Sequence, residues 1–310
     1  MRWSVSKSKE YQNCPRKWYL STVFANSRAK DPLRKETFLL KQLRSVYAWR
    51  GLIVDIAIDK VIIPALKNGI IPKEEDVLKF AFDLSDQQLD FGKKQKYKQE
   101  GMVKSKAGDL YCAFFELEYG NGLDDILIEK MKEEIKVAIS NLLKSEIIYE
   151  IKNADRIISQ RSLIMSFDEF SITSTPDLIL FYNDKPPTII DWKVHSGRNT
   201  DYWLQLGTYA YVLSNVKPHV DFPNNFKDLV NDAHKIKLIE FQLLKNLQKV
   251  YQLTEEDICD IEDHMYLTGT HMLITINNVE DNLSNIPTTS YPSCCEFCNF
   301  KKMCMELNKK

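Results

Sequence analysis

Apolar residues recur at helical spacing over much of the first half of the chain. The pattern is longest between Glu36 and Lys67, which are expected to bound one long helix. Further helices are expected over Gly108–Tyr119 and Asp124–Lys144. The polar segment that begins at Ser4 is expected to be a turn leading into a short helix around Pro15–Phe24. The first half is therefore predicted to be mostly helical.

The pattern changes to that of short β-strands in the middle of the chain. Asn183–Pro187 has the composition of a hairpin turn and joins the last two of these strands. The β-prone runs are 162–166, 169–173, 177–182 and 188–193.

A mixed pattern of helix and strand follows. A helix is expected through Tyr202–Leu213, and either Asn199 or Thr200 can cap its start. A strand is expected over Lys235–Leu243 and a helix over Glu255–Ile274. An antiparallel meander packed between helices indicates an α/β or α+β fold rather than a helical bundle.

Composition and charge add few constraints. Hydrophobic residues make up 44% and charged residues 27% of the 310 positions, as in an ordinary globular protein with a sizeable core. The longest apolar stretch, Leu52–Ile63, is interrupted by charged residues and is not expected to cross a membrane. Met1–Glu10 lacks the apolar segment of a signal peptide, so a cytoplasmic location is expected. With a net charge of −1, any site for a polyanion must be a local patch.

Two carboxylates and a lysine are expected to meet at the ends of neighbouring strands. Asp177 begins one strand of the predicted hairpin, whereas Asp191 and Lys193 close the other and share one face. Such oxygen ligands suit Mg²⁺ or Mn²⁺, and the lysine would hold an attacking water or a phosphate. Exposed strand ends often carry Asp and Lys without any such role. Asp191, however, lies in an apolar run, where an unpaired carboxylate is costly.

The spacing of these residues resembles that of the PD-(D/E)xK nuclease superfamily: Pro176-Asp177, thirteen residues, then Asp191-Trp192-Lys193. The resemblance implies a restriction-endonuclease-like core with a central mixed sheet and an antiparallel meander flanked by helices. It implies metal ligation by Asp177, Asp191 and the Trp192 carbonyl, and a Lys193 that positions the nucleophile.

Gln205 and Tyr209 add a Q-x-x-x-Y pattern on the following helix, where residues four apart share a face. This pattern resembles the RecB-like branch of the superfamily, of the Cas4, AddB and exonuclease V type. The resemblance implies that both side chains orient the active site or touch the DNA backbone.

Gly51, Asp55 and Asp59 fall on the G-x-x-x-H-x-x-x-E helix pattern of the same branch. Asp55 stands where a histidine is usual, and Asp59 where a glutamate is usual. A carboxylate ligates Mg²⁺ or Mn²⁺ at least as naturally as imidazole, so Asp55 is expected to assist as a metal ligand. The alternative is that both acids belong to a polar stripe on a helix.

Cysteines cluster near the end of the chain, where Cys294, Cys295, Cys298 and Cys304 fall within eleven residues. In a reducing compartment such clusters indicate metal binding before disulfides. Cys295, Cys298 and Cys304 have C-x₂-C-x₅-C spacing, and three cysteines require a fourth ligand.

The same resemblance implies a [4Fe–4S] cluster held by Cys14, Cys295, Cys298 and Cys304. Zinc is an alternative metal, and Cys294 offers an alternative register. Cys112 and Cys259 are expected to be small core residues.

The resemblance runs from Cys14 to Cys304 and implies one nuclease domain over 1–310. Within it, 1–35 and 285–310 would form the iron–sulfur part, 36–150 a mostly helical part, and 151–284 the catalytic sheet with its following helices. Basic residues near the cysteines are candidate phosphate contacts, although solvation explains them equally well. They are Lys7, Lys9, Arg16 and Lys17.

The expected function is divalent-metal-dependent hydrolysis of DNA, especially of single-stranded DNA or DNA ends, in repair, recombination or antiviral defence. No phosphate-binding G-x-x-x-x-G-K-[ST] loop occurs, so a helicase motor would come from a partner subunit. Two alternatives remain. One is a catalytically weak DNA-binding or scaffolding subunit, which the missing histidine favours, and the other is a ribonuclease with the same chemistry.

Overall fold

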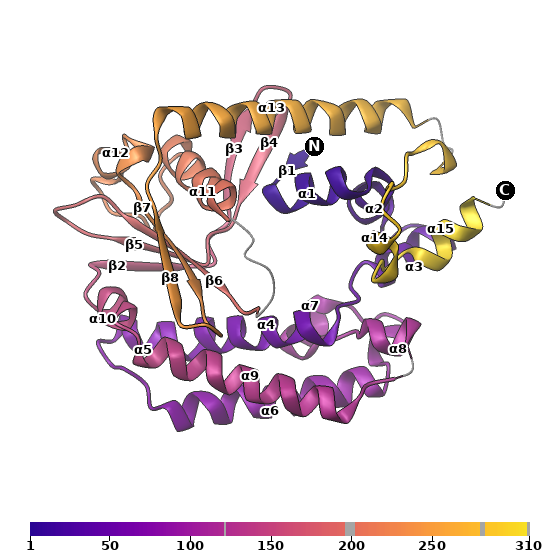
Figure 1. Ribbon diagram of the computed structural model, residues 1–310, viewed down its shortest axis with the longest axis horizontal. Helices are drawn as coiled ribbons and strands as arrows, with labels where there is room; N and C mark the ends of the chain where they lie inside the picture. The colour runs from indigo at the N-terminus through magenta and orange to yellow at the C-terminus, as the bar shows by residue number, and fades with distance from the viewer. Residues whose placement is uncertain (121, 196–201, 280–282, 309–310) are drawn as a thin grey trace.

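A five-stranded mixed β-sheet lies in one half of the computed structural model, at the left of Figure 1; the structure describes residues 1–120, 122–195, 202–279 and 283–308. Neighbouring strands are antiparallel except for β6 and β7, which are parallel. The expected α/β architecture with a central mixed sheet is confirmed. In sheet order the strands are β2 (Arg156–Ser159), β5 (Leu178–Phe181), β6 (Thr188–Lys193), β7 (Lys237–Gln242) and β8 (Leu247–Tyr251).

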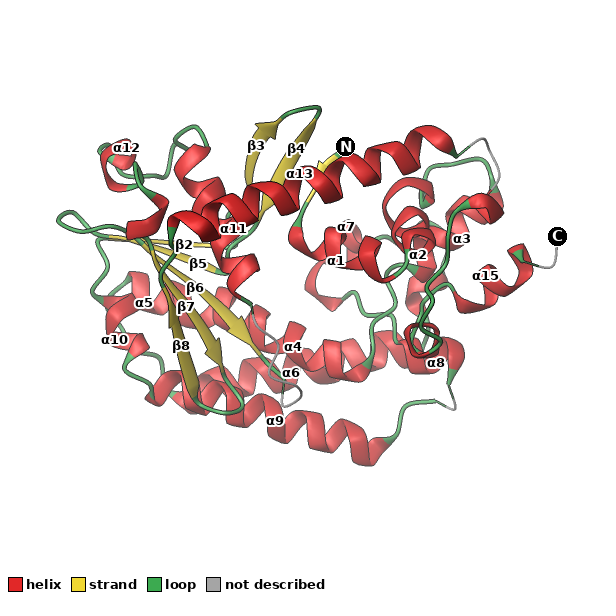
Figure 2. Cartoon of the chain, turned by 45° about the horizontal axis from the view of Figure 1, so that its top comes forward, coloured by secondary structure: helices red, strands yellow, loops and turns green. Residues whose placement is uncertain are grey.

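Helices cover both faces of this sheet (Figure 2). One face shares a hydrophobic core with α4 (Val46–Ala57), α6 (Glu74–Lys93) and α9 (Asp125–Lys144). The other face packs on α11 (Trp203–Asn215) and α13 (Glu255–Asn278). Because both faces are covered, β5, β6 and β7 are buried along nearly their whole length.

The first residues of the chain join a second, smaller sheet. Its central strand β4 (Phe170–Ser174) pairs in parallel with β1 (Arg2–Trp3) and antiparallel with β3 (Leu163–Phe167). Helix α1 (Val5–Asn13) follows and lies along α13 (Figure 1). The start of the chain is thus held beside α11 and α13.

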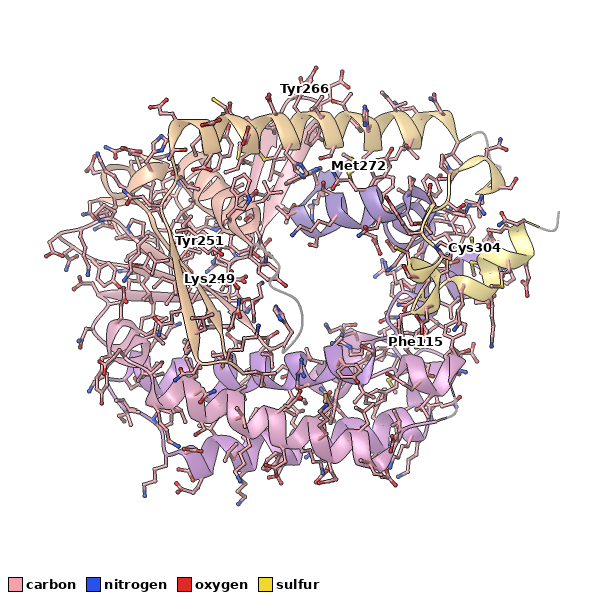
Figure 3. The ribbon with its side chains drawn as sticks, viewed as in Figure 1. Phe115, Lys249, Tyr251, Tyr266, Met272 and Cys304 are labelled. Atoms are coloured by element: carbon pink, nitrogen blue, oxygen red, sulfur yellow. The ribbon has the colours of Figure 1, made fainter. Side chains whose placement is uncertain are left out.

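A third hydrophobic core lies at the end of the molecule that carries Phe115 and Cys304, opposite Lys249 and Tyr251 of β8 (Figure 3). Segments from both ends and from the middle of the chain build it, including α2 (Pro15–Tyr19), α3 (Pro32–Leu40), α8 (Phe115–Tyr119) and α15 (Lys301–Leu307). Helix α14 (Ser293–Glu296) lies just before α15. The remaining short helices are α5 (Ile63–Lys67), α7 (Lys104–Ala107), α10 (Ile147–Lys152) and α12 (Phe226–Leu229).

The prediction of a single helix over 36–67 is wrong, because the helix is interrupted between α3 and α4. Arg44 forms a bridge to Phe114, with the Arg44 N–H donating to the Ala113 carbonyl at 2.9 Å. Ser45 then caps α4 by accepting from the Ala48 N–H. This long-range pairing interrupts a helix that local periodicity alone would continue.

Two other helical predictions also need correction. Residues 111–114 are extended and buried rather than helical, since they provide the partner for Arg44; only a 3₁₀ turn (Gly108–Leu110) and α8 flank them. The segment after Ser4 is a helix, α1, and not a turn. Polar contacts anchor α1 to α13, including a 2.9 Å hydrogen bond between Ser8 and His264, so apolar spacing did not reveal it.

The other predicted elements are present with shifts of a few residues at their ends. The helix around Pro15–Phe24 is α2 followed by a π-turn, and α9, the four middle strands, the hairpin, α11, β7 and α13 all form. The predicted caps Asn199 and Thr200 lie outside the described residues. The long helix α6 and the strands β1, β2 and β8 were not predicted. Within the described ranges, no helix combines the length and apolarity needed to cross a bilayer.

Two helix glycines allow a matched test of how tightly α11 is held against α13. A Cβ at Gly207 would lie 2.6 Å from the Cδ1 atom of Ile261, a fully buried side chain, whereas a Cβ at Gly51 meets nothing within 4 Å. Gly207→Ala is expected to lower the free energy of unfolding by about 1–2 kcal/mol through overpacking. Gly51→Ala is expected to raise it by about 0.5–1 kcal/mol through helix propensity. Urea denaturation measures both, and equal gains in the two variants would contradict this packing.

Candidate functional site

The hairpin of β5 and β6 sets Asp177 beside the end of β6. Leu178 pairs with Ile190, so the register carries Asp177 opposite Asp191. The Trp192 N–H donates to Asp177 Oδ2 at 2.9 Å, which fixes this carboxylate at the strand end. Asp191 itself is only 2% exposed. Two acids that are fourteen residues apart in the sequence thus lie on adjacent strands at one edge of the core.

Helix α4 brings a third carboxylate, Asp55, to the same place. Burial and the charge of Asp191 raise the pKa of Asp55 to about 7, against the opposing effects of Lys193 and Arg44. Burial and the charge of Asp55 likewise raise the pKa of Asp177. Burial and the charge of Asp177 raise that of Asp191. Each acid therefore feels the negative charge of another, which indicates one shared site.

Lys193 supplies the compensating positive charge. Its ammonium forms an ion pair with Asp191 Oδ2, and this oxygen has no other hydrogen-bond donor among the described residues. The ammonium also lies 4.4 Å from the centre of the Tyr202 ring. Burial lowers the pKa of Lys193, but the charges of Asp191 and Asp177 outweigh it and leave the pKa raised. Lys193 is therefore a cationic donor at neutral pH.

Gln205 connects the charged groups to α11. Its Nε2 donates to Asp191 Oδ1 at 3.2 Å and to the Tyr209 hydroxyl at 2.6 Å, and its Oε1 accepts from Lys193 Nζ at 3.4 Å. Burial and the charges of the acids keep the pKa of Tyr209 well above its ordinary value, so the phenol stays neutral. The two residues of the Q-x-x-x-Y pattern thus orient the Asp191–Lys193 pair.

Of the other predicted positions, Asp59 lies apart from this group, and Trp192 belongs to it through its backbone alone. The Asp59 carboxylate accepts from the Ser159 hydroxyl at 2.8 Å and so holds the edge strand β2. Trp192 points its side chain into the core on the α4 side, away from the face shared by Asp191 and Lys193. Gly51 lies in α4, one turn before Asp55.

Sequence reasoning missed two polar neighbours. Gln160, in a left-handed conformation with φ of 49°, donates to Asp177 Oδ1 at 3.1 Å. Glu240 of β7 is fully buried opposite Asp191 and adds to the rise in the pKa of Asp191. An acid inside the apolar run Leu238–Phe241 is the same cue that singled out Asp191, and it could have found Glu240.

The donor set fits a hard divalent cation by charge and by ligand type. Three carboxylates lie within electrostatic reach of one lysine, and a divalent cation among them would offset the mutual repulsion that, with burial, raises their pKa values. Within the residues that the structure describes, no three His, Cys, Asp or Glu side chains are already grouped as a metal site. Mutual repulsion and the ion pair of Lys193 with Asp191 both oppose closer convergence.

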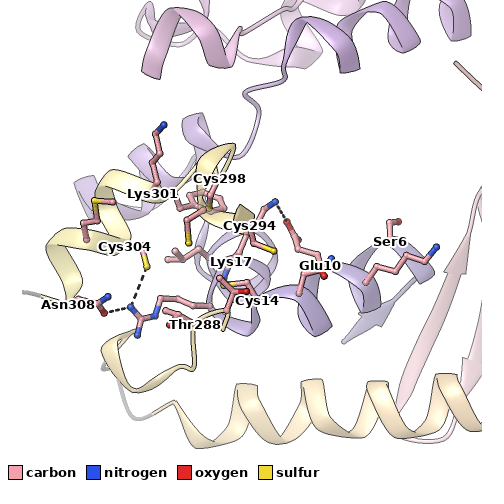
Figure 4. Close-up of a pocket in the computed structure, with 18 residues that line it drawn as sticks. Ser6, Glu10, Cys14, Lys17, Thr288, Cys294, Cys298, Lys301, Cys304 and Asn308 are labelled. Carbon is pink, nitrogen blue, oxygen red and sulfur yellow. Dashed lines mark hydrogen bonds and ion pairs between the residues drawn. The ribbon is translucent and has the colours of Figure 1, made fainter. Parts of the chain in front are cut away.

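The cysteines line a cavity of about 570 Å³ near the ends of the chain (Figure 4). Three of the sulfur atoms are within hydrogen-bond reach of N–H groups. The Lys17 N–H donates to Cys14 at 3.4 Å, Arg16 Nη1 donates to Cys304 at 3.5 Å, and the Phe300 backbone donates to Cys298. The five cysteines that line the cavity are Cys14, Cys294, Cys295, Cys298 and Cys304.

The two remaining cysteines lie elsewhere. Cys112 is buried in the core, as predicted. Cys259 is exposed on α13, so the expectation of a core residue was wrong. The buried face of α13 begins at Ile261 and continues through Met265 and Met272, and position 259 lies on the opposite, solvent-facing side.

Hydrogen bonds from Arg16 join the two ends of the chain beside the cysteines. Its side chain is buried, with Nε donating to the Ile286 carbonyl at 3.0 Å and Nη2 donating to the Ser284 carbonyl at 2.9 Å. Nη1 also reaches Asn308, and the Arg16 N–H donates to the Pro287 carbonyl at 3.0 Å. The proximity of 1–35 and 285–308 is therefore maintained by hydrogen bonds of the protein itself.

Comparison with known proteins identifies a family. The pattern of the PD-(D/E)XK nuclease superfamily matches residues 2–305. Among curated proteins none matches the sequence. Among solved structures, the chain in "Crystal structure of SSO0001" is 12% identical, with 73% of this chain and 96% of that chain covered and a TM-score of 0.33.

The carboxylates predict a pH-dependent effect of divalent cations on stability. The pKa of Asp55 in the folded protein is about 7, above the ordinary 3.8, so protonation of Asp55 favours the folded state. This contribution to stability is fully present below about pH 4 and is lost as the pH rises through about 7. Mn²⁺ requires the deprotonated ligands and should restore stability mainly at high pH. We expect MnCl₂ to raise the midpoint of thermal unfolding by several degrees at pH 8, and far less at pH 5. Asp191→Asn should reduce the shift, and equal shifts at both pH values would contradict the site.

Proposed function

Because the chain belongs to the PD-(D/E)XK nuclease superfamily, which makes it a metal-dependent nuclease, we propose that it hydrolyses phosphodiester bonds of DNA. Single-stranded DNA or DNA ends are the proposed substrates, and repair, recombination or defence the proposed processes. We also assign the whole chain to one nuclease domain of the RecB-like branch. The resemblance carried by Gln205, Tyr209 and the cysteines supports these finer assignments.

One observation carries the proposal: Asp177 and Asp191 face each other at the end of β6, with Lys193 paired to Asp191 and Asp55 within electrostatic reach of both acids. In our proposal Asp55, Asp177 and Asp191 hold Mg²⁺ or Mn²⁺, with the Trp192 carbonyl as a further ligand. When bound, the cation supplies a Lewis acid that activates water and stabilises charge on the phosphate.

Lys193 contributes through its fixed charge. Its raised pKa keeps the ammonium protonated, so it donates hydrogen bonds to a phosphate oxygen or to the attacking water and does not remove a proton. Gln205 holds Lys193 and Asp191 in one orientation. The neutral Tyr209 supports Gln205 from the next turn of α11.

Cleavage of end-labelled single-stranded and double-stranded DNA and of RNA, with Mn²⁺ or Mg²⁺, tests the proposal. Asp191→Asn and Lys193→Met should each lower kcat by about 10²–10³-fold, because each removes charge that stabilises the transition state. Asp76→Asn, on the exposed start of α6, is the matched control and should leave cleavage unchanged.

The same assay separates the alternatives. Asp55→His, which restores the residue usual in the branch, should retain cleavage with Mn²⁺, whereas Asp55→Ala should lose most of it. DNA binding without cleavage in every metal would contradict catalysis and favour a scaffolding subunit. Faster cleavage of RNA than of DNA would contradict the proposed substrate.

We further propose that Cys14, Cys295, Cys298 and Cys304 bind a [4Fe–4S] cluster. This proposal is supported by the N–H groups that donate to three of the four sulfur atoms. Thiolate ligands of metal clusters accept hydrogen bonds of this kind. Cys294 lines the same cavity and competes with Cys295 as the ligand from α14.

Two adjacent serine substitutions test this assignment. Anaerobically purified protein should be brown, with iron and sulfide in equal amounts and absorbance near about 400 nm. Cys295→Ser should lose the iron, while Cys294→Ser and the exposed Cys259→Ser should keep it. Loss of iron only in Cys294→Ser would reverse the register. A colourless protein with stoichiometric zinc would contradict the cluster.

A further inference from the structure

A second polar cavity, of about 330 Å³, adjoins the carboxylates on the side of the N-terminus. Gln205 and Tyr209 line it and also contact Asp191 or its hydrogen-bond partner, so one layer of side chains separates the cavity from the carboxylates. Three segments distant in the sequence form the remaining walls: 2–7, the end of β4 with Thr175, and Thr208 of α11. We call it the hydroxyl cavity.

The lining of the hydroxyl cavity combines positive charge with hydroxyl groups. Arg2 and Lys7 supply the charge; the Lys7 ammonium donates to the Arg2 carbonyl at 3.0 Å, and neither side chain has an ion-pair partner among the residues that the structure describes. None of the described lining residues is acidic. The hydroxyl groups come from Ser4, Ser6, Thr173, Ser174, Thr175, Thr208 and Tyr209.

Ser174 lines the hydroxyl cavity and carries a buried hydroxyl that the described residues do not satisfy. Its side chain is 3% exposed, yet its Oγ has no hydrogen-bond partner in the described part of the chain, and the same holds for Thr173 Oγ1. A buried hydroxyl without a partner costs about 1–3 kcal/mol, which is unusual unless a bound group satisfies it.

The start of α1 adds backbone donors to the same wall. Ser4 caps this nine-residue helix, and its Oγ accepts from the Lys7 N–H at 3.4 Å. The first N–H groups of a helix have no partners within the helix and carry partial positive charge. Such a terminus, together with Arg2, Lys7 and a buried hydroxyl, recognises a tetrahedral anion.

We propose that the hydroxyl cavity binds a phosphate group of the nucleic-acid substrate, next to the phosphate at the carboxylates. The proposal rests on the proposed nuclease function and gives the N-terminal residues a part in substrate binding. Lys7 and Arg2 offset the charge of the phosphate, while Ser174 and the α1 N–H groups donate hydrogen bonds to its oxygens. The phosphate is either an internal diester or a terminal monoester, since both present the same oxygens.

Equilibrium binding tests this site independently of cleavage. Fluorescent single-stranded DNA oligonucleotides with a 5′-phosphate, a 3′-phosphate or hydroxyls at both ends are titrated with the protein in Ca²⁺ at several salt concentrations. Lys7→Gln should weaken binding about tenfold and reduce the slope of log K against log salt by about 0.7, the value for one phosphate contact. Lys136→Gln, on the exposed surface of α9, is the matched control and should change neither quantity.

Ser174→Ala distinguishes a role in binding from a purely structural effect. Because the hydroxyl has no partner, this variant should fold with an unchanged or higher melting temperature and still bind the oligonucleotides several-fold more weakly. Equal weakening for all oligonucleotides identifies an internal diester. Loss of a preference for one phosphorylated end identifies a terminal monoester.

Unchanged affinity and salt slope in both variants, for every oligonucleotide, would overturn the proposal, as would failure of the unsubstituted protein to bind any of them. Failure of the nuclease function has a different signature. In that case the unsubstituted protein binds with the same dependence on Lys7 and Ser174 but does not cleave in Mn²⁺ or Mg²⁺.

Discussion

Three carboxylates are held close to one another at the buried end of β6, although their charges repel. Burial disfavours their charged forms, each acid raises the pKa of another, and Lys193 compensates only one of them directly. A fold that relaxed freely would separate these groups or expose them to water. Their retention requires a frame rigid enough to oppose the repulsion, and it gives the site its affinity for a divalent cation.

The frame is assembled from contacts between distant segments. The hairpin register and the Trp192 N–H fix Asp177 opposite Asp191. The Arg44–Phe114 bridge and the Ser45 cap fix where α4 begins, and hence where Asp55 meets the strands. On the other face of the sheet, the absence of a side chain at Gly207 lets α11 approach α13 closely and present Gln205 to Asp191. Arg16 joins the two ends of the chain and keeps the cysteines around one cavity.

Local pattern was sufficient to predict strands β3 to β7 and the hairpin between β5 and β6, which brings Asp177 beside Asp191. An acid inside an apolar strand is costly, which singled out Asp191, and a tight turn dictates which residues face each other. Local pattern failed where long-range or polar contacts decide the structure. The break at Arg44 depends on a segment about seventy residues away, and α1 is anchored through polar contacts such as Ser8 with His264. Gln160 was missed because its contact with Asp177 appears only once β2 is placed in the sheet, whereas Glu240 was overlooked although it stands inside an apolar run. Cys259 was misjudged because its position on α13 faces solvent.

Anomalous X-ray diffraction from crystals grown with Mn²⁺ would locate the cation relative to the three carboxylates. A Mn²⁺ peak is expected within about 2.5 Å of carboxylate oxygens of Asp177 and Asp191, with Asp55 as a further ligand and the Lys193 ammonium beside it. A peak bound elsewhere, or a Mn²⁺-soaked crystal in which these three carboxylates coordinate no metal, would contradict it.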